Sequence, residues 1–201
     1  MPKILTKQNF IDALKKFTST NGISNFIDIF PSNIITIDET SEDGAGEIYL
    51  DISAYSSSQI FFIKINHLSK HAIGEQKNHN DGIVLKVNLE EAKIYIYLFE
   101  LKKQLRFNKL EKASKQLMSA YRFIKYMQLE ECFEVKFKFH TVSELNNLSF
   151  DSDNIKHFTR YQKKLFDAVY ENKDKIPLMI PFCNHQEYDF QHIDFGATLI
   201  I

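Results

Sequence analysis

The sequence predicts an α/β (α+β) fold with a mixed central sheet flanked by helices. Short runs of β-branched, aromatic and aliphatic residues, bounded by polar segments, predict several strands. Two long segments carry apolar residues at helical spacing, and one of them lies between predicted strands. This order of elements is typical of a mixed sheet, and we expect residues 1–201 to form a single domain.

The N-terminal part of the chain is predicted to contain one helix and three strands. Apolar residues recur at helical spacing over residues 7–18, and Asn21-Gly22 ends the helix. The β-type runs that follow occupy residues 34–37, 47–52 and 59–65. Residues 67–80 are polar and histidine-rich, which is typical of a loop or a short helix.

The central part of the chain predicts two strong strands, a helix and a further strand. The two strands occupy residues 82–87 and 94–101. One apolar stripe predicts a helix over residues 109–128. The alternation of Phe and Val with Glu and Lys then predicts a strand over residues 133–139 with one wet face.

The C-terminal part predicts a second long helix, over residues 154–172, where apolar residues again recur at helical spacing. Two late strands are expected at residues 176–182 and 197–201. The segment 185–194 between them is rich in ligand-type side chains, and is interpreted either as a polar loop or as a second metal site.

Composition narrows the class of protein. Hydrophobic residues make up 44% and charged residues 25%, as in soluble globular proteins, and the net charge of −1 argues against a uniformly basic coat for nucleic acid. The only cysteines, Cys132 and Cys183, are too far apart in sequence for a zinc ribbon. Without a signal peptide or an apolar run of spanning length, we expect a cytoplasmic protein with no membrane partner.

A β-hairpin with acidic residues at its open end is predicted around Glu90-Glu91. With the turn centred there, the opposed residues form apolar pairs, Val87 with Ile94, Leu85 with Ile96 and Ile83 with Leu98. The same register places Asp81 opposite Glu100. Because side chains alternate along a strand, Asp81, Glu100 and Lys102 then project to one face.

Two carboxylates at the end of an aliphatic strand pair point to a divalent cation. Burying paired charges costs several kcal/mol unless a cation or hydrogen bonds compensate. Mg²⁺ takes such oxygen ligands, polarises a phosphate and lowers the pKa of an attacking water. Lys102 would orient that water or stabilise charge that develops on the phosphate.

The hairpin resembles the PD-(D/E)XK motif of the restriction-endonuclease-like superfamily. The matching segments are residues 81–84, DGIV, and 96–102, IYLFELK. In that family an Asp opens one strand, a Glu-X-Lys closes the next, and a helix and another strand follow. The resemblance covers about residues 58–140. It implies a restriction-endonuclease-like core, Asp81 and Glu100 as ligands of Mg²⁺ or Mn²⁺, and Lys102 as the catalytic lysine.

The sequence departs from the family pattern in several places. Asn80 stands where the family often has Pro, and the predicted helix at the N-terminus contains no Glu to supply the further upstream acid. Glu47 or Glu75 would have to supply this further acid, and the sequence does not indicate which of the two does so. Accessory roles are open to His79, which projects the same way as Asp81, and to Gln116 on the following helix.

A basic segment follows the motif. Eight basic residues lie between residues 102 and 125, and Glu111 is the only acid among them. Such a concentration beside the site would neutralise phosphates, and a solvated helix face is the alternative interpretation. The residues expected to bind nucleic acid are Lys103, Arg106, Lys109 and Lys112.

These observations predict a Mg²⁺-dependent nuclease, which hydrolyses phosphodiester bonds of DNA in preference to RNA. The resemblance implies a part in a prokaryotic restriction or anti-phage (antiviral) defence system, and the chain length suggests a homodimer or a partner subunit. The alternative is a catalytically inactive nuclease-fold subunit that binds nucleic acid or scaffolds a partner protein. A plain protein-interaction module is the third reading, favoured if Asp81 and Glu100 lie far apart.

Overall fold

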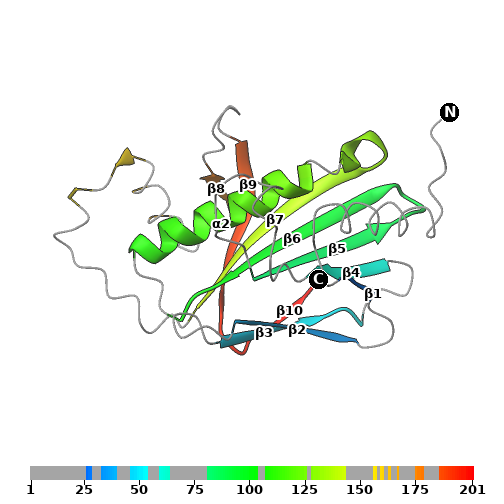
Figure 1. The fold of residues 1–201 in the computed structure, drawn as a ribbon, viewed down its shortest axis with the longest axis horizontal. Coiled ribbons are helices and arrows are strands. Elements are labelled where there is room, and N and C mark those ends of the chain that lie inside the picture. The colour runs from blue at the N-terminus through cyan, green and yellow to red at the C-terminus, as the bar shows by residue number, and fades with distance from the viewer. Residues whose placement is uncertain are drawn as a thin grey trace.

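Within the residues that it describes, a computed structural model shows two β-sheets and one long helix (Figure 1). The residues that the structure describes are 26–28, 33–39, 46–53, 59–63, 81–103, 107–125, 128–143, 156–157, 159–160, 163, 167, 175–178 and 186–201. The helix expected over residues 7–18 and the histidine-rich segment 67–80 lie outside them. Among the described residues, no helix has both the length and the apolar character needed to cross a membrane.

The larger sheet has seven strands in the order β1-β4-β5-β6-β7-β9-β8. Along the chain, these strands are β1 (Phe26–Asp28), β4 (Gln59–Ile63), β5 (Gly82–Asn88), β6 (Lys93–Leu101), β7 (Glu134–Ser143), β8 (Lys175–Leu178) and β9 (Gln186–Asp194). Neighbours are antiparallel from β1 to β6, whereas β6, β7 and β9 run parallel. The mixed central sheet predicted from the sequence is therefore confirmed.

The β5–β6 hairpin has the predicted register. Its ladder opposes the three expected apolar pairs and extends from Asn88–Lys93 at the turn to Gly82–Phe99 at the open end. In the turn, the Asn88 side chain accepts a hydrogen bond from the Glu91 backbone N–H (3.0 Å). Every residue from Gly82 to Val87 is buried, because layers cover both faces of the strand.

Helix α2 (Phe107–Lys125) follows β6, and a short 3₁₀ turn, η1 (Leu129–Glu131), precedes β7. This crossover is what two parallel neighbouring strands require. The described helix ends three residues before its predicted end, and Gln128 has a left-handed backbone (φ 53°) that a continuing helix excludes. The side chains that α2 buries are Ala113, Gln116, Leu117, Met118, Ser119, Ala120, Tyr121 and Ile124.

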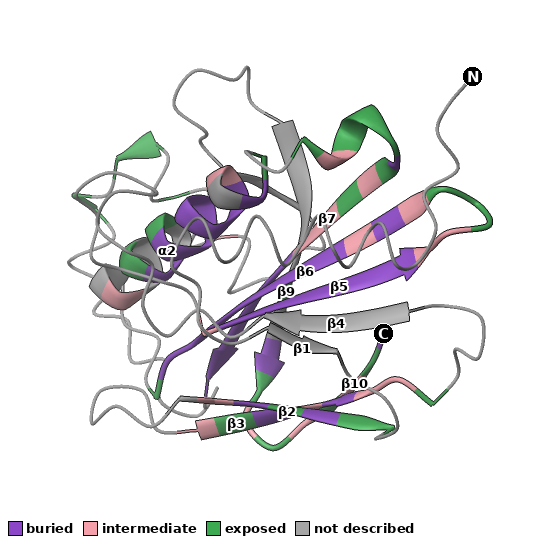
Figure 2. Ribbon diagram, turned by 45° about the vertical axis from the view of Figure 1, so that its right-hand side comes forward, coloured by how far each residue is buried: buried purple, intermediate pink, exposed green. Residues whose placement is uncertain are grey.

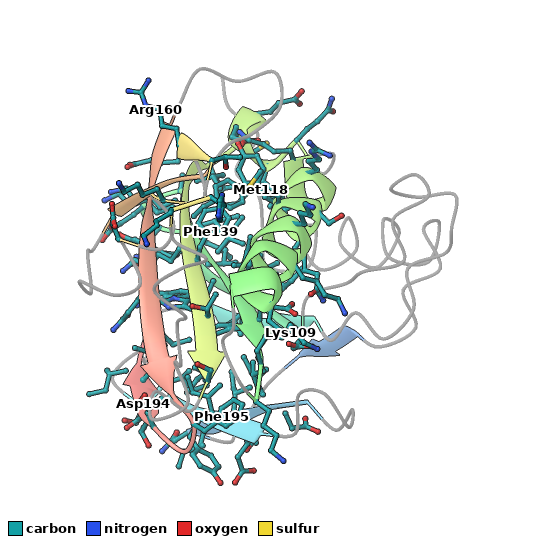
Figure 3. The ribbon with its side chains drawn as sticks, turned by 90° about the vertical axis from the view of Figure 1, so that its left-hand side faces the viewer. Lys109, Met118, Phe139, Arg160, Asp194 and Phe195 are labelled. Carbon is teal, nitrogen blue, oxygen red and sulfur yellow. The ribbon has the colours of Figure 1, made fainter. Side chains whose placement is uncertain are left out.

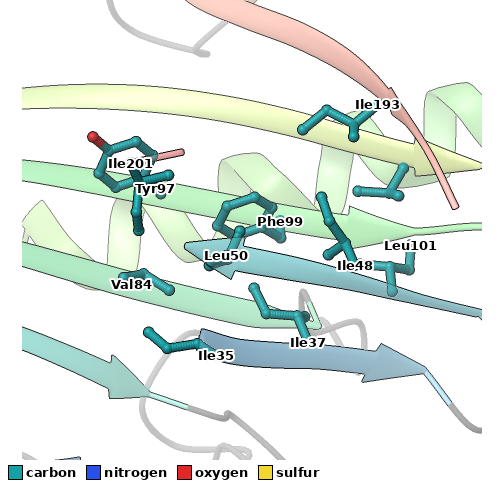
Figure 4. Close-up of a cluster of buried hydrophobic side chains, with 11 residues drawn as sticks. Ile35, Ile37, Ile48, Leu50, Val84, Tyr97, Phe99, Leu101, Ile193 and Ile201 are labelled. Carbon is teal, nitrogen blue, oxygen red and sulfur yellow. The ribbon is translucent and has the colours of Figure 1, made fainter. Parts of the chain in front are cut away.

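The smaller sheet has three strands, β2 (Ile34–Glu39), β3 (Gly46–Asp51) and β10 (Thr198–Ile200), in the order β10-β3-β2. The sequence predicted these runs as strands, but no local pattern indicated that they form a second sheet. The cluster of buried side chains in Figure 4 joins Ile48 and Leu50 of this sheet to Tyr97 and Phe99 of β6. Because β2 and β3 each have only one apolar face, they form a separate layer over the larger sheet.

The C-terminal part differs from expectation in one element. Residues Gln186–Asp194 form β9, which pairs with β7 and β8 in the larger sheet, and not a loop. Most of the helix expected over residues 154–172 lies outside the described residues, although the Lys163 backbone N–H donates to the Thr159 carbonyl (2.9 Å), a helical spacing. The expected late strands correspond to β8 and β10.

Candidate functional site

The residues singled out by the sequence lie at the open end of the β5–β6 hairpin. The ladder ends with the pair Gly82–Phe99, so Asp81 directly precedes β5, and Glu100 occupies the next position of β6. Lys102 follows the last residue of the same strand. The ladder thus has the predicted register but ends one position before the expected Asp81–Glu100 pair, which stays a prediction.

Glu100 projects to the side of the sheet that α2 covers. In the parallel β6–β7 ladder, Leu98 pairs with Phe139 and Glu100 with the next same-face residue, Thr141. The Tyr121 ring of α2 packs against the Phe139 ring, with centroids 6.1 Å apart. Since alternate residues of a strand share a face, Glu100 and Thr141 face the helix layer as well.

Asp81 is held against the backbone of β6 on both sides of Glu100. The Asp81 backbone N–H donates to the Phe99 carbonyl (3.1 Å), and the Asp81 carboxylate accepts a hydrogen bond from the Leu101 backbone N–H (2.5 Å). These two contacts fix both the main chain and the side chain of Asp81. The carboxylate is only partly buried, so one side of the site is open to solvent.

Glu100 and Lys102 form a buried ion pair. The Lys102 ammonium donates to the Glu100 carboxylate and to the Leu101 carbonyl (3.0 Å). Glu100 is fully buried, and the Lys102 side chain is only 8% exposed. The Lys102 backbone N–H also donates to the Val142 carbonyl of β7 (2.8 Å), so the neighbouring strand anchors the lysine.

The sequence did not indicate that several polar side chains of β7 and α2 are buried, one of them, Thr141, as the ladder partner of Glu100. Thr141 and Ser143 of β7 are fully buried, in a strand that continues four residues beyond its predicted end at Phe139. Gln116 and Ser119 of α2 are also buried, although Gln116 was a candidate only for an accessory role. The alternation of Thr141 and Ser143 with Val142 was the available signal for a polar row beside Glu100.

The other candidates for the further acid or an accessory group do not join the site within the described residues. Glu47 is exposed on β3 of the smaller sheet, where it accepts a hydrogen bond from the Tyr49 hydroxyl and raises the pKa of that hydroxyl. The smaller sheet covers the opposite face of the larger sheet from Glu100. Glu75 and His79 lie outside the described residues.

The predicted nucleic-acid-binding residues cluster around the start of α2. Lys103 and Lys112 are exposed, and Lys109 is half-buried near the end of the helix at which the chain enters it (Figure 3). This end follows directly from the strand that carries Glu100. Arg106 lies outside the described residues.

Asp81 and Glu100 carry oxygen donors, the type of ligand that a hard cation such as Mg²⁺ takes. No group of three or more His, Cys, Asp or Glu side chains with metal-binding geometry occurs within the described part of the chain. Mg²⁺ is commonly held by one or two carboxylates together with waters and substrate phosphates, so Asp81 and Glu100 are the residues of this site that could hold it. Glu100 in particular is a buried anion already paired with a cationic group.

His140, which the sequence reasoning missed, lies on the other face of the sheet, beside Phe99 in the ladder. Its ring stacks on the rings of Phe99 (4.7 Å between centroids) and Tyr97 (6.0 Å). Burial, with a smaller contribution from Lys138, lowers the pKa of His140 to about 3. The described residues provide no hydrogen-bond partner to either ring nitrogen, so this histidine is a neutral core residue.

Comparisons with known proteins return no relative: no family model, no curated protein and no solved structure matches the chain.

Proposed function

We propose that the protein is a metal-dependent nuclease that hydrolyses phosphodiester bonds of DNA, with its site at Asp81, Glu100 and Lys102. The observation that carries the proposal is the buried Glu100–Lys102 pair, with Asp81 fixed against the backbone on both sides of Glu100. A fully buried carboxylate is costly unless a cation compensates it. An acid–lysine pair at a partly open strand end is an arrangement that phosphate chemistry uses.

The chain's own groups have separable roles in this proposal. Asp81 and Glu100 would hold Mg²⁺ or Mn²⁺, which when bound lowers the pKa of a water and offsets phosphate charge. Lys102, anchored by β7 and by the Leu101 carbonyl, presents its ammonium beside the Glu100 carboxylate. There it orients the attacking water or stabilises charge on the phosphate. Lys103, Lys109 and Lys112 would hold the DNA backbone.

The order of elements supports a restriction-endonuclease-like core within about residues 58–140. The antiparallel strands β4, β5 and β6 lead through α2 to β7, which is parallel to β6. This is the hairpin, helix and strand order that the motif implies. We further propose a role in a restriction or anti-phage defence system, as a homodimer or beside a partner subunit.

A non-catalytic nucleic-acid-binding or scaffolding subunit is the second candidate. It is favoured by the engagement of both carboxylates within the protein, Asp81 with the Leu101 N–H and Glu100 with Lys102. The described residues also bring no third acid to the site. In this alternative the Glu100–Lys102 pair stabilises the fold and takes no part in catalysis.

The test is cleavage of linear and circular DNA by the purified protein in Mg²⁺, Mn²⁺ and EDTA. We expect metal-dependent cleavage that is lost in Glu100→Gln, Lys102→Met and Asp81→Asn. Asparagine keeps an acceptor for the Leu101 N–H, so this variant removes charge and retains the contact. Glu91→Gln is the matched control, because Glu91 forms an ion pair with Lys93 at the exposed end of the same hairpin.

Cleavage that survives in folded Glu100→Gln, or that EDTA does not stop, contradicts the proposed site. Absence of cleavage by the wild type in either metal, with DNA binding retained, favours the non-catalytic subunit. Circular dichroism melting curves of every variant separate a lost site from a lost fold.

A further inference from the structure

The smaller sheet has one face that points away from the larger sheet. Its other face is buried, and there Ile35, Ile48 and Leu50 join the cluster shared with β6. Because successive side chains of a strand point to opposite faces, the residues between these buried ones lie on the outer face. The ladder arranges the outer face in two rows across β10, β3 and β2, which are Ile200–Asp51–Ile34 and Thr198–Tyr49–Thr36.

Two isoleucines of the outer face are exposed to solvent. Ile200 is 70% exposed and Ile34 is 52% exposed, and within the described part of the chain they are the large hydrophobic residues with the greatest exposure. They lie on either side of Asp51 in one row, about 10 Å apart, since neighbouring strands are about 4.8 Å apart. The chain therefore leaves an apolar and acidic row in contact with water (Figure 2).

Strand β10 is an edge of the smaller sheet and has backbone groups that point outward. The Ile201 N–H donates to the Asp51 carbonyl of β3 (3.2 Å), so Ile201 faces its neighbour. Backbone groups of successive residues point to opposite sides of a strand, so those of Thr198 and Ile200 point to the outer edge. Edge strands are often protected from further pairing by charged side chains or proline, and β10 contains neither. The edge is thus suited to the addition of another strand.

The charge of the smaller sheet is negative. Strands β2, β3 and β10 contain acidic residues but no lysine, arginine or histidine. Hydrogen bonds from the side chain and the backbone N–H of Ser53 lower the pKa of the Asp51 carboxyl, so the centre of the exposed row is an anion at neutral pH. Nucleic acid or the same sheet of a second copy would bring like charges together, which is unfavourable. A cationic protein segment is complementary to this surface.

We propose that the edge of β10 and the outer face bind an extended, basic segment of a partner protein by strand addition. The residue opposite Ile200 is a lysine or arginine. Its aliphatic stem packs on Ile200, and its charged end reaches Asp51 across β10. Because β10 has only three residues, backbone pairing is short, and these side-chain contacts supply the specificity.

This surface is separate from the candidate nuclease site. The smaller sheet covers the face of the larger sheet opposite Glu100, so the bound segment needs neither a metal ion nor the Glu100–Lys102 pair. The inference therefore does not rest on nuclease activity. It specifies instead the chemistry by which a partner subunit is recognised.

The test is fluorescence anisotropy of a labelled synthetic peptide of about eight residues, in which lysine and valine alternate, titrated with the purified protein in EDTA. We expect Asp51→Asn to weaken binding about tenfold at low salt, because the lysine loses its charged acceptor. Ile200→Thr should weaken binding about threefold or more, since the lysine stem loses apolar contact.

Thr198→Pro tests the backbone contribution directly. Proline removes an N–H that points to the outer edge and leaves the bonds between β10 and β3 in place, so it should weaken binding at least about tenfold. Methylation of alternate backbone nitrogens of the peptide provides the reciprocal test. Methylation of the set that faces β10 should abolish binding, and methylation of the other set should preserve it.

Asp38→Asn is the matched control, because it removes the same charge from the outer face of β2, away from β10. An equal loss of binding in this variant would overturn the inference, as would unchanged binding in Asp51→Asn or Thr198→Pro. Equal binding of a peptide with glutamate in place of lysine, equal tolerance of both methylated sets, or absence of binding by the wild type would overturn it too. Melting curves confirm that each variant is folded.

Sedimentation of the protein without peptide distinguishes a second copy from a different partner. A dimer that Thr198→Pro dissociates would assign the edge to a second copy and overturn the inference. The two proposals fail separately: peptide binding without DNA cleavage contradicts only the nuclease proposal, and DNA cleavage without peptide binding contradicts only the present inference.

Discussion

The β5–β6 hairpin carries the same three-residue pattern, Glu-X-Lys, at both of its ends. Glu91 and Lys93 form an ion pair at the turn (2.8 Å), where their side chains are 56% and 35% exposed. Glu100 and Lys102 pair at the open end, where both are buried. Figure 2 shows this gradient, from the exposed turn to the buried interior of the strands. The pattern is identical in sequence, so burial alone distinguishes the candidate site from a surface pair.

The physical consequence is a difference in how the two pairs are held. Water competes for Glu91 and Lys93, and such exposed pairs contribute little to stability. Burial removes that competition at the open end, so each of Glu100 and Lys102 depends on its partner. Only the buried pair therefore maintains the fixed geometry that binding or catalysis needs.

The largest predicted effect comes from separating the buried pair. Glu100→Met or Lys102→Met alone leaves a buried charge without its partner and should lower the free energy of unfolding by about 3–5 kcal/mol. The double variant should lose less than the sum of the two, because no isolated charge remains. Urea denaturation of the three variants measures this coupling.

Glu91→Met is the control for this cycle, and its unfolding midpoint should match that of the wild type. The comparison breaks down if Glu91→Met and Glu100→Met are equally destabilising. It also breaks down if the double variant loses the full sum, since the two buried groups would then act independently.

His140 extends the comparison between the buried and the exposed Glu–Lys pair, because it is a buried titratable group without a partner of opposite charge. Its pKa is lowered from 6.5 to about 3, so the unfolded chain binds more protons than the folded chain between these values. Stability is therefore constant above about pH 6.5 and falls by about 1.4 kcal/mol per pH unit below it. At pH 4.5 the expected loss is about 3 kcal/mol.

His140→Phe should remove this part of the acid sensitivity, since the ring stays stacked on Phe99 but cannot take up a proton. The measurement is urea denaturation of both proteins at intervals from pH 4.5 to pH 7.5, within the range that the linkage relation covers. Parallel stability curves for the wild type and the variant would show that His140 does not titrate as its burial requires.

The smallest predicted effect concerns packing, and it compares the addition of a methyl group at two glycines, Gly46 and Gly196. A Cβ at Gly46 would lie 2.3 Å from the Phe195 ring, whereas a Cβ at Gly196 would meet nothing within 4 Å. We expect Gly46→Ala to destabilise the protein by about 1–3 kcal/mol, because the ring must move out of the core contact. Thermal unfolding followed by circular dichroism measures the change.

Phe195→Leu is the companion variant, and Gly46→Ala should cost less in its background because the ring is absent. An unchanged cost in that background would place the origin of the destabilisation elsewhere. Gly196→Ala also carries a cost, from a backbone at φ +76° and not from packing, and Phe195→Leu should leave that cost unchanged.

Much of the fold could be predicted because its patterns are local. Alternation and apolar runs identified β2, β3, β5, β6 and β10, and the cross-strand apolar pairs fixed the hairpin register. The same register predicted Asp81 at the open end of the hairpin, where its main chain and side chain bond to the backbone of Phe99 and Leu101. Strand β9 was missed because its ligand-type residues resemble a polar loop, and only its neighbours β7 and β8 make it a strand.

The sequence by itself determined the hairpin, the helix after it and the common face of Glu100 and Lys102, because side-chain periodicity is a property of the local backbone. Tertiary structure alone decided that Glu100 is buried and Glu91 is not, that His140 is neutral, and that β2, β3 and β10 form a second sheet. Each of these depends on which segments pack over a residue. Burial and charge state arise from contacts between distant parts of the chain, which no local pattern records.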